Sequence, residues 1–95
     1  MSSLRKSAAG EHCTIEIPGI CGYDPSTVVL AHIRLPGTGV SRKPHDLHGV
    51  YACHRCHDVI DRRVLSHEFE ENRWFYIARG LMRTHERMLE KGVLR

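Results

Sequence analysis

Four cysteines arranged as two pairs are the feature that most restricts how this chain can fold. Seven residues separate Cys13 from Cys21, and two separate Cys53 from Cys56. A tetrahedral zinc site takes four thiolates, commonly from two short chelating loops, and a turn at Pro18–Gly19 would close the wider one. A chain of 95 residues buries a small core, so zinc would add folding free energy that the core lacks. The cysteines therefore predict a structural four-cysteine zinc site.

The second cysteine pair has two other interpretations. Its Cys-x-x-Cys spacing occurs in thioredoxin-type redox motifs, but those need a βαβ unit for which this chain has no room. Residues 53–57 read Cys-His-Arg-Cys-His, which matches the attachment pattern of c-type haem, and Met82 or Met88 could be an axial ligand. The haem interpretation leaves Cys13 and Cys21 unexplained and lacks an export signal, so zinc is the favoured prediction.

Hydropathy and charge exclude several classes of protein. The longest apolar runs, such as residues 28–31, are far too short for a transmembrane helix. Residues 1–10 contain Arg5 and Lys6 without an apolar segment behind them, so we expect no secretory signal and a cytoplasmic location. Paired cysteines in the cytosol are more often metal ligands than disulfides. A net charge of +3 and eight histidines fit an anionic partner.

The middle of the chain predicts two short strands followed by a helix. Residues 27–33 are rich in β-branched side chains, and residues 49–52 suit a second strand. Residues 34–48 between them contain two prolines and two glycines, which predicts a long loop of the kind that is often functional. Apolar side chains at helical spacing predict a short helix over residues 54–64.

The last third of the chain predicts one amphipathic helix over residues 66–92. Ser66 can cap it, and acidic residues follow in the first turns, where the helix dipole favours them. One apolar stripe would pack on the core: Trp74, Ile77, Ala78, Leu81, His85 and Met88. We therefore expect a single α+β domain, with a flexible N-terminal segment at 1–10, a zinc-bound core at 11–65 and this helix packed on the core.

Two segments that carry histidines resemble the HNH, or ββα-metal, nuclease family. They are Val-Leu-Ala-His-Ile at 29–33 and Asp-Leu-His-Gly-Val-Tyr-Ala-Cys-His-Arg-Cys-His-Asp at 46–58. The family pattern is a histidine at a strand end, a long loop, an Asn or His, and then Cys-x-x-Cys-His in a helix. The resemblance runs from about Cys13 to Val64, and it implies a small zinc-stabilised ββα-metal (HNH) core with the C-terminal helix packed on it.

A closer resemblance rests on three shorter segments. These are Cys-Thr-Ile-Glu-Ile-Pro-Gly-Ile-Cys, Leu-Ala-His-Ile and Ala-Cys-His-Arg-Cys-His-Asp. Within the family they are most similar to the short prophage-encoded YbcO type. The resemblance implies an endonuclease that hydrolyses phosphodiester bonds in DNA with the help of a divalent metal.

The resemblance also implies roles for three histidines. His32 would be the general base, His57 would ligate a catalytic divalent metal such as Mg, Mn or Ni, and His48 would orient the base or join the metal. A histidine with a pKa near its ordinary value of about 6.5 suits water activation, and a cation offsets charge that develops on the leaving oxygen. Asp61 lies four residues after His57 and could hydrogen-bond its ring.

One position departs from the family pattern. Ala31 stands where many members have an acidic metal ligand, so the second ligand stays open among His45, Asp46 and His48. A zinc-stabilised module that binds nucleic acid without cleaving it is therefore the alternative function.

Basic residues predict contact with a phosphate backbone. They outnumber acidic residues between positions 31 and 63, and the candidates that would bind nucleic acid are Arg34, Arg42, Lys43, Arg62 and Arg63. Nothing in the sequence resembles a code for reading bases, so we expect contacts to the backbone of DNA. A homodimer is compatible with this interpretation, because a small nuclease that cuts two strands would gain from a second copy.

Overall fold

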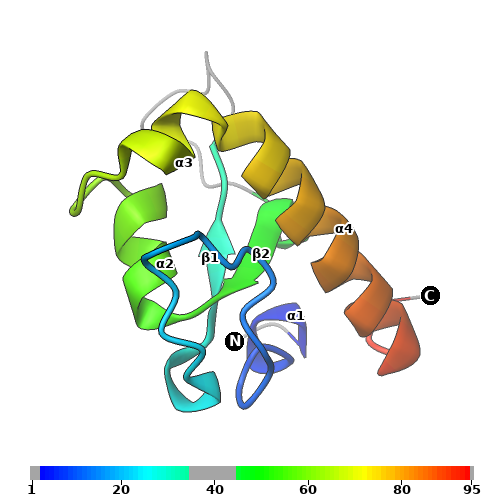
Figure 1. Ribbon diagram of the computed structural model, residues 1–95. Coiled ribbons are helices and arrows are strands. Elements are labelled where there is room, and N and C mark those ends of the chain that lie inside the picture. Colours follow the sequence, from blue (N-terminus) through cyan, green and yellow to red (C-terminus); the bar gives the residue numbers. More distant parts are fainter. Residues whose placement is uncertain (1–2, 35–44, 95) are drawn as a thin grey trace.

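The computed structural model describes residues 3–34 and 45–94. This part of the chain is a small α+β fold in which a two-stranded sheet lies among helices (Figure 1). Its α-helices and strands, in chain order, are α1 (Ser3–Lys6), β1 (Val29–His32), β2 (Gly49–Ala52), α2 (His54–Ile60), α3 (His67–Glu71) and α4 (Arg73–Glu90). Short 3₁₀ turns at Pro25–Thr27 and Asp46–His48 precede the two strands. Arg42 and Lys43, which we predict to bind nucleic acid, lie outside the described residues.

Both predicted strands are present, and they pair in antiparallel fashion. Val29 lies opposite Ala52, and His32 lies opposite Gly49. β1 begins two residues later than expected, because the carboxylate of Asp24 accepts a hydrogen bond of 3.0 Å from the backbone of Ser26 and starts a 3₁₀ turn. The antiparallel register places His32 at the end of β1, beside the segment that leads into β2.

Strand β2 is buried throughout, because elements cover both faces of the sheet. Helix α4 packs on the face of Val50, where a Cβ atom added to Gly80 would lie 3.1 Å from Val50 Cγ1. On the opposite face, the hydroxyl of Tyr51 lies 2.6 Å from Ser7 Oγ in the turn after α1. Glycine at position 80 therefore lets the backbone of α4 approach the sheet closely.

A buried polar network joins α4 to the sheet. The backbone N–H of Tyr51 donates to Thr84 Oγ1 at 3.0 Å, and Thr84 Oγ1 lies 2.9 Å from Thr14 Oγ1. Thr14 in turn donates to the carbonyl of Tyr51 at 3.0 Å. Thr84 has no exposed surface, so its hydroxyl is a required partner for the strand.

The C-terminal region, expected to form one helix, forms two. Ser66 caps α3 as predicted, by accepting from the backbone of Phe69 at 3.2 Å. The chain then breaks at Asn72, whose side-chain amide donates to the carbonyl of Glu68 at 3.0 Å. The break lets α3 and α4 run in different directions over the core (Figure 1).

The buried face of α4 also differs from the expected stripe. Ile77 and Met88 are buried as predicted, but Trp74 is 47% exposed. The buried residues of α4 are Tyr76, Ile77, Gly80, Thr84 and Met88. The helix is rotated toward its small residues because they allow a closer approach to β2 than the larger apolar side chains would. No helix within residues 3–34 and 45–94 combines the length and the hydropathy needed to cross a bilayer.

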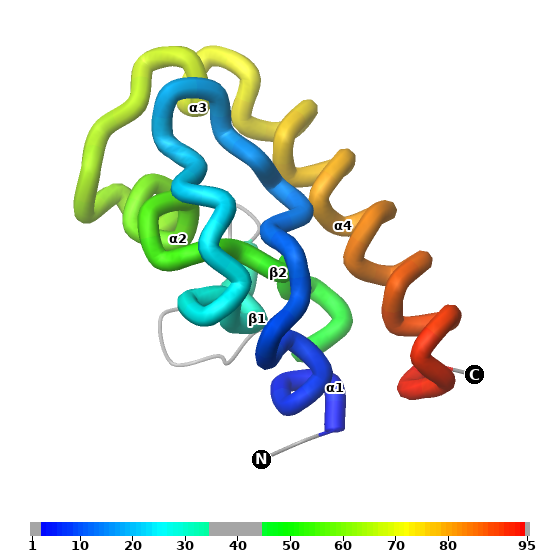
Figure 2. The backbone as a smooth tube through the Cα atoms, turned by 60° about the horizontal axis from the view of Figure 1, so that its bottom comes forward, coloured from blue at the N-terminus to red at the C-terminus, as the bar shows by residue number. Residues whose placement is uncertain are grey.

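The segment after α1 is packed against the rest of the molecule. Ala8 is 1% exposed, and the ammonium group of Lys91 donates to the carbonyl of Ser7 at 2.7 Å. The following residues run alongside α4 (Figure 2). Arg87 on that helix donates to the carboxylate of Glu11 at 2.7 Å. Contacts from the C-terminal end of the chain therefore hold this segment in place.

We predict that Thr84→Val destabilises the fold by about 1–3 kcal/mol, because the nearly isosteric side chain leaves the buried N–H of Tyr51 without an acceptor. Denaturant unfolding of the two proteins measures the difference. Thr84→Ala, which also removes a buried methyl group, should cost more. A Thr84→Val variant with an unchanged free energy of unfolding would contradict the role of the hydroxyl.

Candidate functional site

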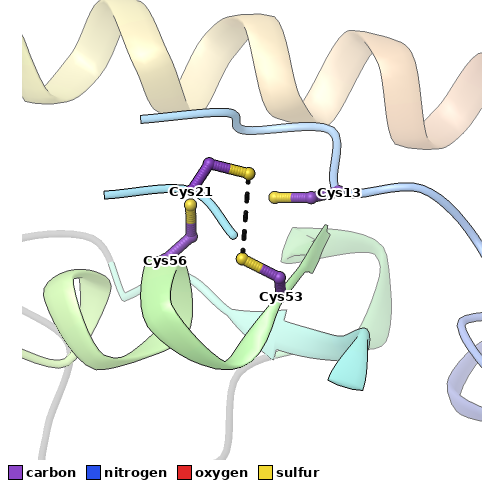
Figure 3. Close-up of side chains that lie close together, drawn as sticks. All are labelled: Cys13, Cys21, Cys53 and Cys56. Atoms are coloured by element: carbon purple, nitrogen blue, oxygen red, sulfur yellow. Dashed lines mark hydrogen bonds between the residues drawn. The ribbon is translucent and has the colours of Figure 1, made fainter. Parts of the chain in front are cut away.

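The four cysteines converge on one point, although they come from two parts of the chain. Cys13 and Cys21 lie in the loop before β1, and Cys53 and Cys56 lie at the start of α2 (Figure 3). All four sulfur atoms lie within 4.8 Å of one another, and those of Cys21 and Cys53 are 3.8 Å apart. The four-cysteine group could therefore hold a metal ion such as zinc. Because the sulfurs of the second pair point at the first pair, the geometry does not favour attachment of a haem.

A turn brings the first cysteine pair together, as the sequence predicts. The carbonyl of Ile17 accepts from the backbone of Ile20 at 3.1 Å and from that of Cys21 at 3.0 Å. Gly19 has a φ of 74°, a conformation that glycine adopts without steric cost. The chain therefore reverses within one turn and returns Cys21 to the neighbourhood of Cys13.

Arginines on α4 hold this cysteine loop. Arg79 donates to the carbonyl of Ile15 at 2.8 Å, and Arg83 donates to the carbonyl of Thr14 at 3.2 Å. The guanidinium carbon of Arg79 also lies 5.3 Å from the centre of the Tyr76 ring. The C-terminal helix thus takes part in positioning the metal-ligand loop, a contact that its sequence pattern did not indicate.

The thiols of the cluster differ in how readily they ionise. The thiol of Cys56 donates toward Cys13 and lowers the pKa of Cys13 to about 5. Burial raises the pKa of Cys21 to about 12, and the bond to Cys13 together with burial raises the pKa of Cys56. The protein alone thus favours a thiolate at Cys13 and opposes thiolates at Cys21 and Cys56. A divalent cation would supply the charge that four thiolates need, and sulfur donors suit zinc.

A second feature is a cavity of about 570 Å³ beside the end of β1. His32 reaches it from β1, and His57 reaches it from α2. The lining residues are Leu30, His32, Arg34, His57, Ile60, Asp61, Arg62 and Arg73. The fold thus brings together five of the residues that the sequence singled out: His32, Arg34, His57, Asp61 and Arg62.

Asp46, and not His48, contacts the ring of His32. Asp46 Oδ1 lies 2.8 Å from His32 Nε2, and the same oxygen accepts from Arg5 Nε at 3.2 Å. The sequence placed His48 in the middle position but left that assignment open, because Asp46 lies only two residues away. This short separation was the available signal that Asp46 could contact His32. The 3₁₀ turn at Asp46–His48 directs Asp46, rather than His48, toward the ring.

Two other histidines set the orientation of that turn. His45 Nδ1 accepts from the backbone of Leu47 at 3.0 Å and caps the turn. His85 on α4 lies 2.6 Å from the carbonyl of Leu47. The side chain of His48 lines a different cavity of about 350 Å³, which is apolar and includes Ile33 and Trp74. The described residues therefore do not place His48 with His32 and His57.

His57 has the partner expected from its spacing. Its Nε2 lies 3.1 Å from Asp61 Oδ2, one helical turn later. Arg63 contacts Asp61 at 3.2 Å and Asp58 at 2.9 Å, and its guanidinium holds the pKa of Asp58 below its usual range. Arg63 is thus engaged with two carboxylates and is not among the residues that line the cavity.

We predict that the purified protein carries one metal ion per chain and that Cys56→Ser loses both this metal and cooperative unfolding. A structural zinc contributes about 10–16 kcal/mol in zinc-finger peptides, which is comparable to the whole stability of a small domain. Elemental analysis and thermal unfolding measure the two effects. His54→Ala is the matched control, because this side chain is 72% exposed and lies between the two cysteines. A well-folded, metal-free Cys56→Ser protein would contradict the metal site.

The whole chain is similar to known proteins. A family model described as "Putative nuclease YbcO" matches residues 2–93. "Putative nuclease YbcO" of Escherichia coli (strain K12) and "Putative nuclease ybcO" of Enterobacteria phage 82 are each 44% identical over 97 residues, which covers 100% of this chain and 99% of theirs. A solved structure described as "Structure of a putative bacteriophage protein from Escherichia coli str. K-12 substr. MG1655" has 41% sequence identity and a TM-score of 0.72, and the match covers 95% of this chain and 100% of that one. The chain therefore belongs to the family described as "Putative nuclease YbcO", which confirms the closer resemblance.

Proposed function

We propose that this protein is a metal-dependent endonuclease of the HNH, or ββα-metal, type that hydrolyses phosphodiester bonds in DNA. The observation that carries the proposal is the placement of His32 and His57 in one cavity with three arginines. The nuclease names of the family and of its bacterial and phage relatives support it. The order of β1, β2 and α2, with Cys53 and Cys56 at the start of α2, agrees with the HNH pattern and supports the proposal.

His32 is the proposed general base. The carboxylate of Asp46 accepts from His32 Nε2, which leaves Nδ1 as the ring atom that can take a proton from water. This arrangement follows the general logic in which a carboxylate fixes the tautomer and orientation of a catalytic histidine. We therefore assign the orienting role to Asp46, while His48 remains a prediction from the resemblance.

His57 and Asp61 are the candidates to hold the catalytic cation, such as Mg, Mn or Ni, since both line the cavity and lie 3.1 Å apart. When bound, this cation would offset charge on the phosphate oxygens. Arg34 and Arg62 would bind the phosphate backbone from the same cavity. The zinc proposed for the four cysteines is structural, because three of the four are buried. A cytoplasmic location and a homodimer stay predictions.

A second candidate function rests on Ala31. This residue is 1% exposed and supplies no ligand at the position where the HNH pattern often has an acid. A zinc-stabilised module that binds nucleic acid without cleaving it is therefore the alternative. This module would use the same cavity and the same arginines as the proposed nuclease, but it would not cleave the nucleic acid that it binds.

We predict that zinc-loaded protein nicks supercoiled plasmid with Mg, Mn or Ni, and that His32→Ala lowers the rate by about 10²- to 10⁴-fold, the usual contribution of a general base. His67→Ala, at an exposed position at the start of α3, is the control and should leave the rate unchanged. Folded, zinc-loaded protein that never nicks DNA with any of these metals would instead favour the binding module.

Asp46→Asn and His48→Ala decide which residue orients the base. If Asp46 has this role, Asp46→Asn slows nicking, because an amide can present its NH₂ group to the ring and favour the wrong tautomer. His48→Ala then has the smaller effect. A larger loss for His48→Ala than for Asp46→Asn would return the orienting role to His48.

A further inference from the structure

The cavity lined by His32 and His57, called here the histidine cavity, has one strongly basic wall. The end of α2 and the start of α4 form this wall. Arg62 follows α2, and Arg73 is the first residue of α4. Together with Arg34 they face a single lining carboxylate, Asp61. Among the described lining residues, cations therefore outnumber anions, and a cavity of about 570 Å³ lies within the size range of ligand sites.

Arg73 is held in place, and within the described residues it uses few of its N–H hydrogen-bond donors. Its side chain is 15% exposed, and its guanidinium carbon lies 5.2 Å from the centre of the Phe69 ring. Among the described residues, its polar contacts are to Glu70 Oε2 and to the carbonyl of Ile60, each at the long distance of 3.5 Å. A guanidinium has five N–H donors, so most of them remain for a ligand.

Arg62 and Arg73 share one counterion. Glu70 Oε1 lies 3.1 Å from Arg62 Nη2, while the other carboxylate oxygen faces Arg73. One carboxylate between two guanidiniums leaves a net positive charge. Burial, and then the charge of Arg62, lowers the pKa of Arg73, so a bound anion would relieve an unfavourable environment.

The backbone conformation of Arg62 is a second observation that points to a functional role for this wall of the cavity. Its φ is 59°, in the left-handed region, at a place after a helix where glycine is usual. A side chain in this conformation carries a steric cost, and such residues cluster at functional sites. The chain keeps an arginine at the rim of this cavity despite that cost.

We propose that Arg73 is a substrate-binding residue that contacts a phosphate of the DNA strand next to the bond that is cleaved. This inference rests on the proposed function, and it names a residue that neither the resemblance nor the sequence pattern indicated. The planar fork of a guanidinium suits two parallel hydrogen bonds to phosphate oxygens. Phe69 restricts the side chain, so less rotamer entropy is lost when it binds.

The test is the salt dependence of DNA binding by the full-length, zinc-loaded protein. Binding of a labelled duplex is measured without other divalent metals, so that no cleavage occurs. Each phosphate contact contributes about 0.9 to the slope of log K against log salt concentration, so Arg73→Gln should reduce the slope by about that amount. A merely structural arginine would change stability but not this slope. An unchanged slope for folded Arg73→Gln overturns the proposal.

Arg87→Gln is the matched control for charge. It removes the same charge from the same helix, about 21 Å further along its axis at 1.5 Å per residue. Arg87 pairs with Glu11 and does not line the cavity. The slope of log K against log salt concentration for Arg87→Gln should equal that of the wild type. Equal reductions for Arg73→Gln and Arg87→Gln would show a nonspecific effect of net charge and overturn the proposal.

Glu70→Gln keeps the test decisive if Arg73→Gln does not fold. Removing the shared carboxylate frees both guanidiniums for phosphate, so binding should become tighter and the slope steeper. Unchanged or weaker binding by Glu70→Gln overturns the proposal in that case. Wild-type protein that binds no DNA overturns the proposed function together with this inference, whereas wild-type binding with an unchanged Arg73→Gln slope overturns the inference alone.

Discussion

The convergence of four cysteine sulfurs is the constraint on which the rest of the structure depends. It fixes α2 against the loop before β1, since Cys53 precedes α2 and Cys56 lies within it. His57 is the next residue, so its position follows from the cluster. His32 is placed by a separate force, the backbone pairing of β1 with β2 opposite Gly49. The histidine cavity lies where these two constraints meet, which is how a chain of 95 residues can hold two side chains in a defined relation.

Features that depend on local spacing could be predicted from the sequence. The two chelating cysteine pairs, the turn at Gly19 and the existence of the two strands all follow from residue types at short separations. The partner of His32 could not be predicted in this way. A 3₁₀ turn presents consecutive side chains in different directions, and the contact from His85 that fixes this turn comes from residues far along the chain. The resemblance therefore located the segment that contacts His32 but not the residue that makes the contact.

The buried face of α4 is a second feature that the sequence pattern did not predict. Counting apolar side chains favoured a stripe that begins at Trp74, yet Gly80 and Thr84 face the sheet. Thr84 is polar by type, but its hydroxyl completes a network with the strand, so its burial carries no unsatisfied group. Gly80 has no side chain to count, although its lack of one is what permits contact with Val50. Thr84 matters because it accepts the backbone N–H of Tyr51, and Gly80 matters because it leaves room for close packing against the sheet. A hydropathy scale describes neither effect.

The arginines of α4 give this helix more than a packing role. Arg79 and Arg83 bind carbonyls of the first cysteine loop, while Arg73 lines the cavity that contains His32 and His57. Successive arginines of one rigid helix thus contact the metal-ligand loop and the candidate active site. Because an α-helix moves as a unit over a few turns, a displacement of the cysteine loop would be transmitted to Arg73. The metal proposed for the cysteines would then support the phosphate contact as well as the fold, even though it takes no part in the chemistry.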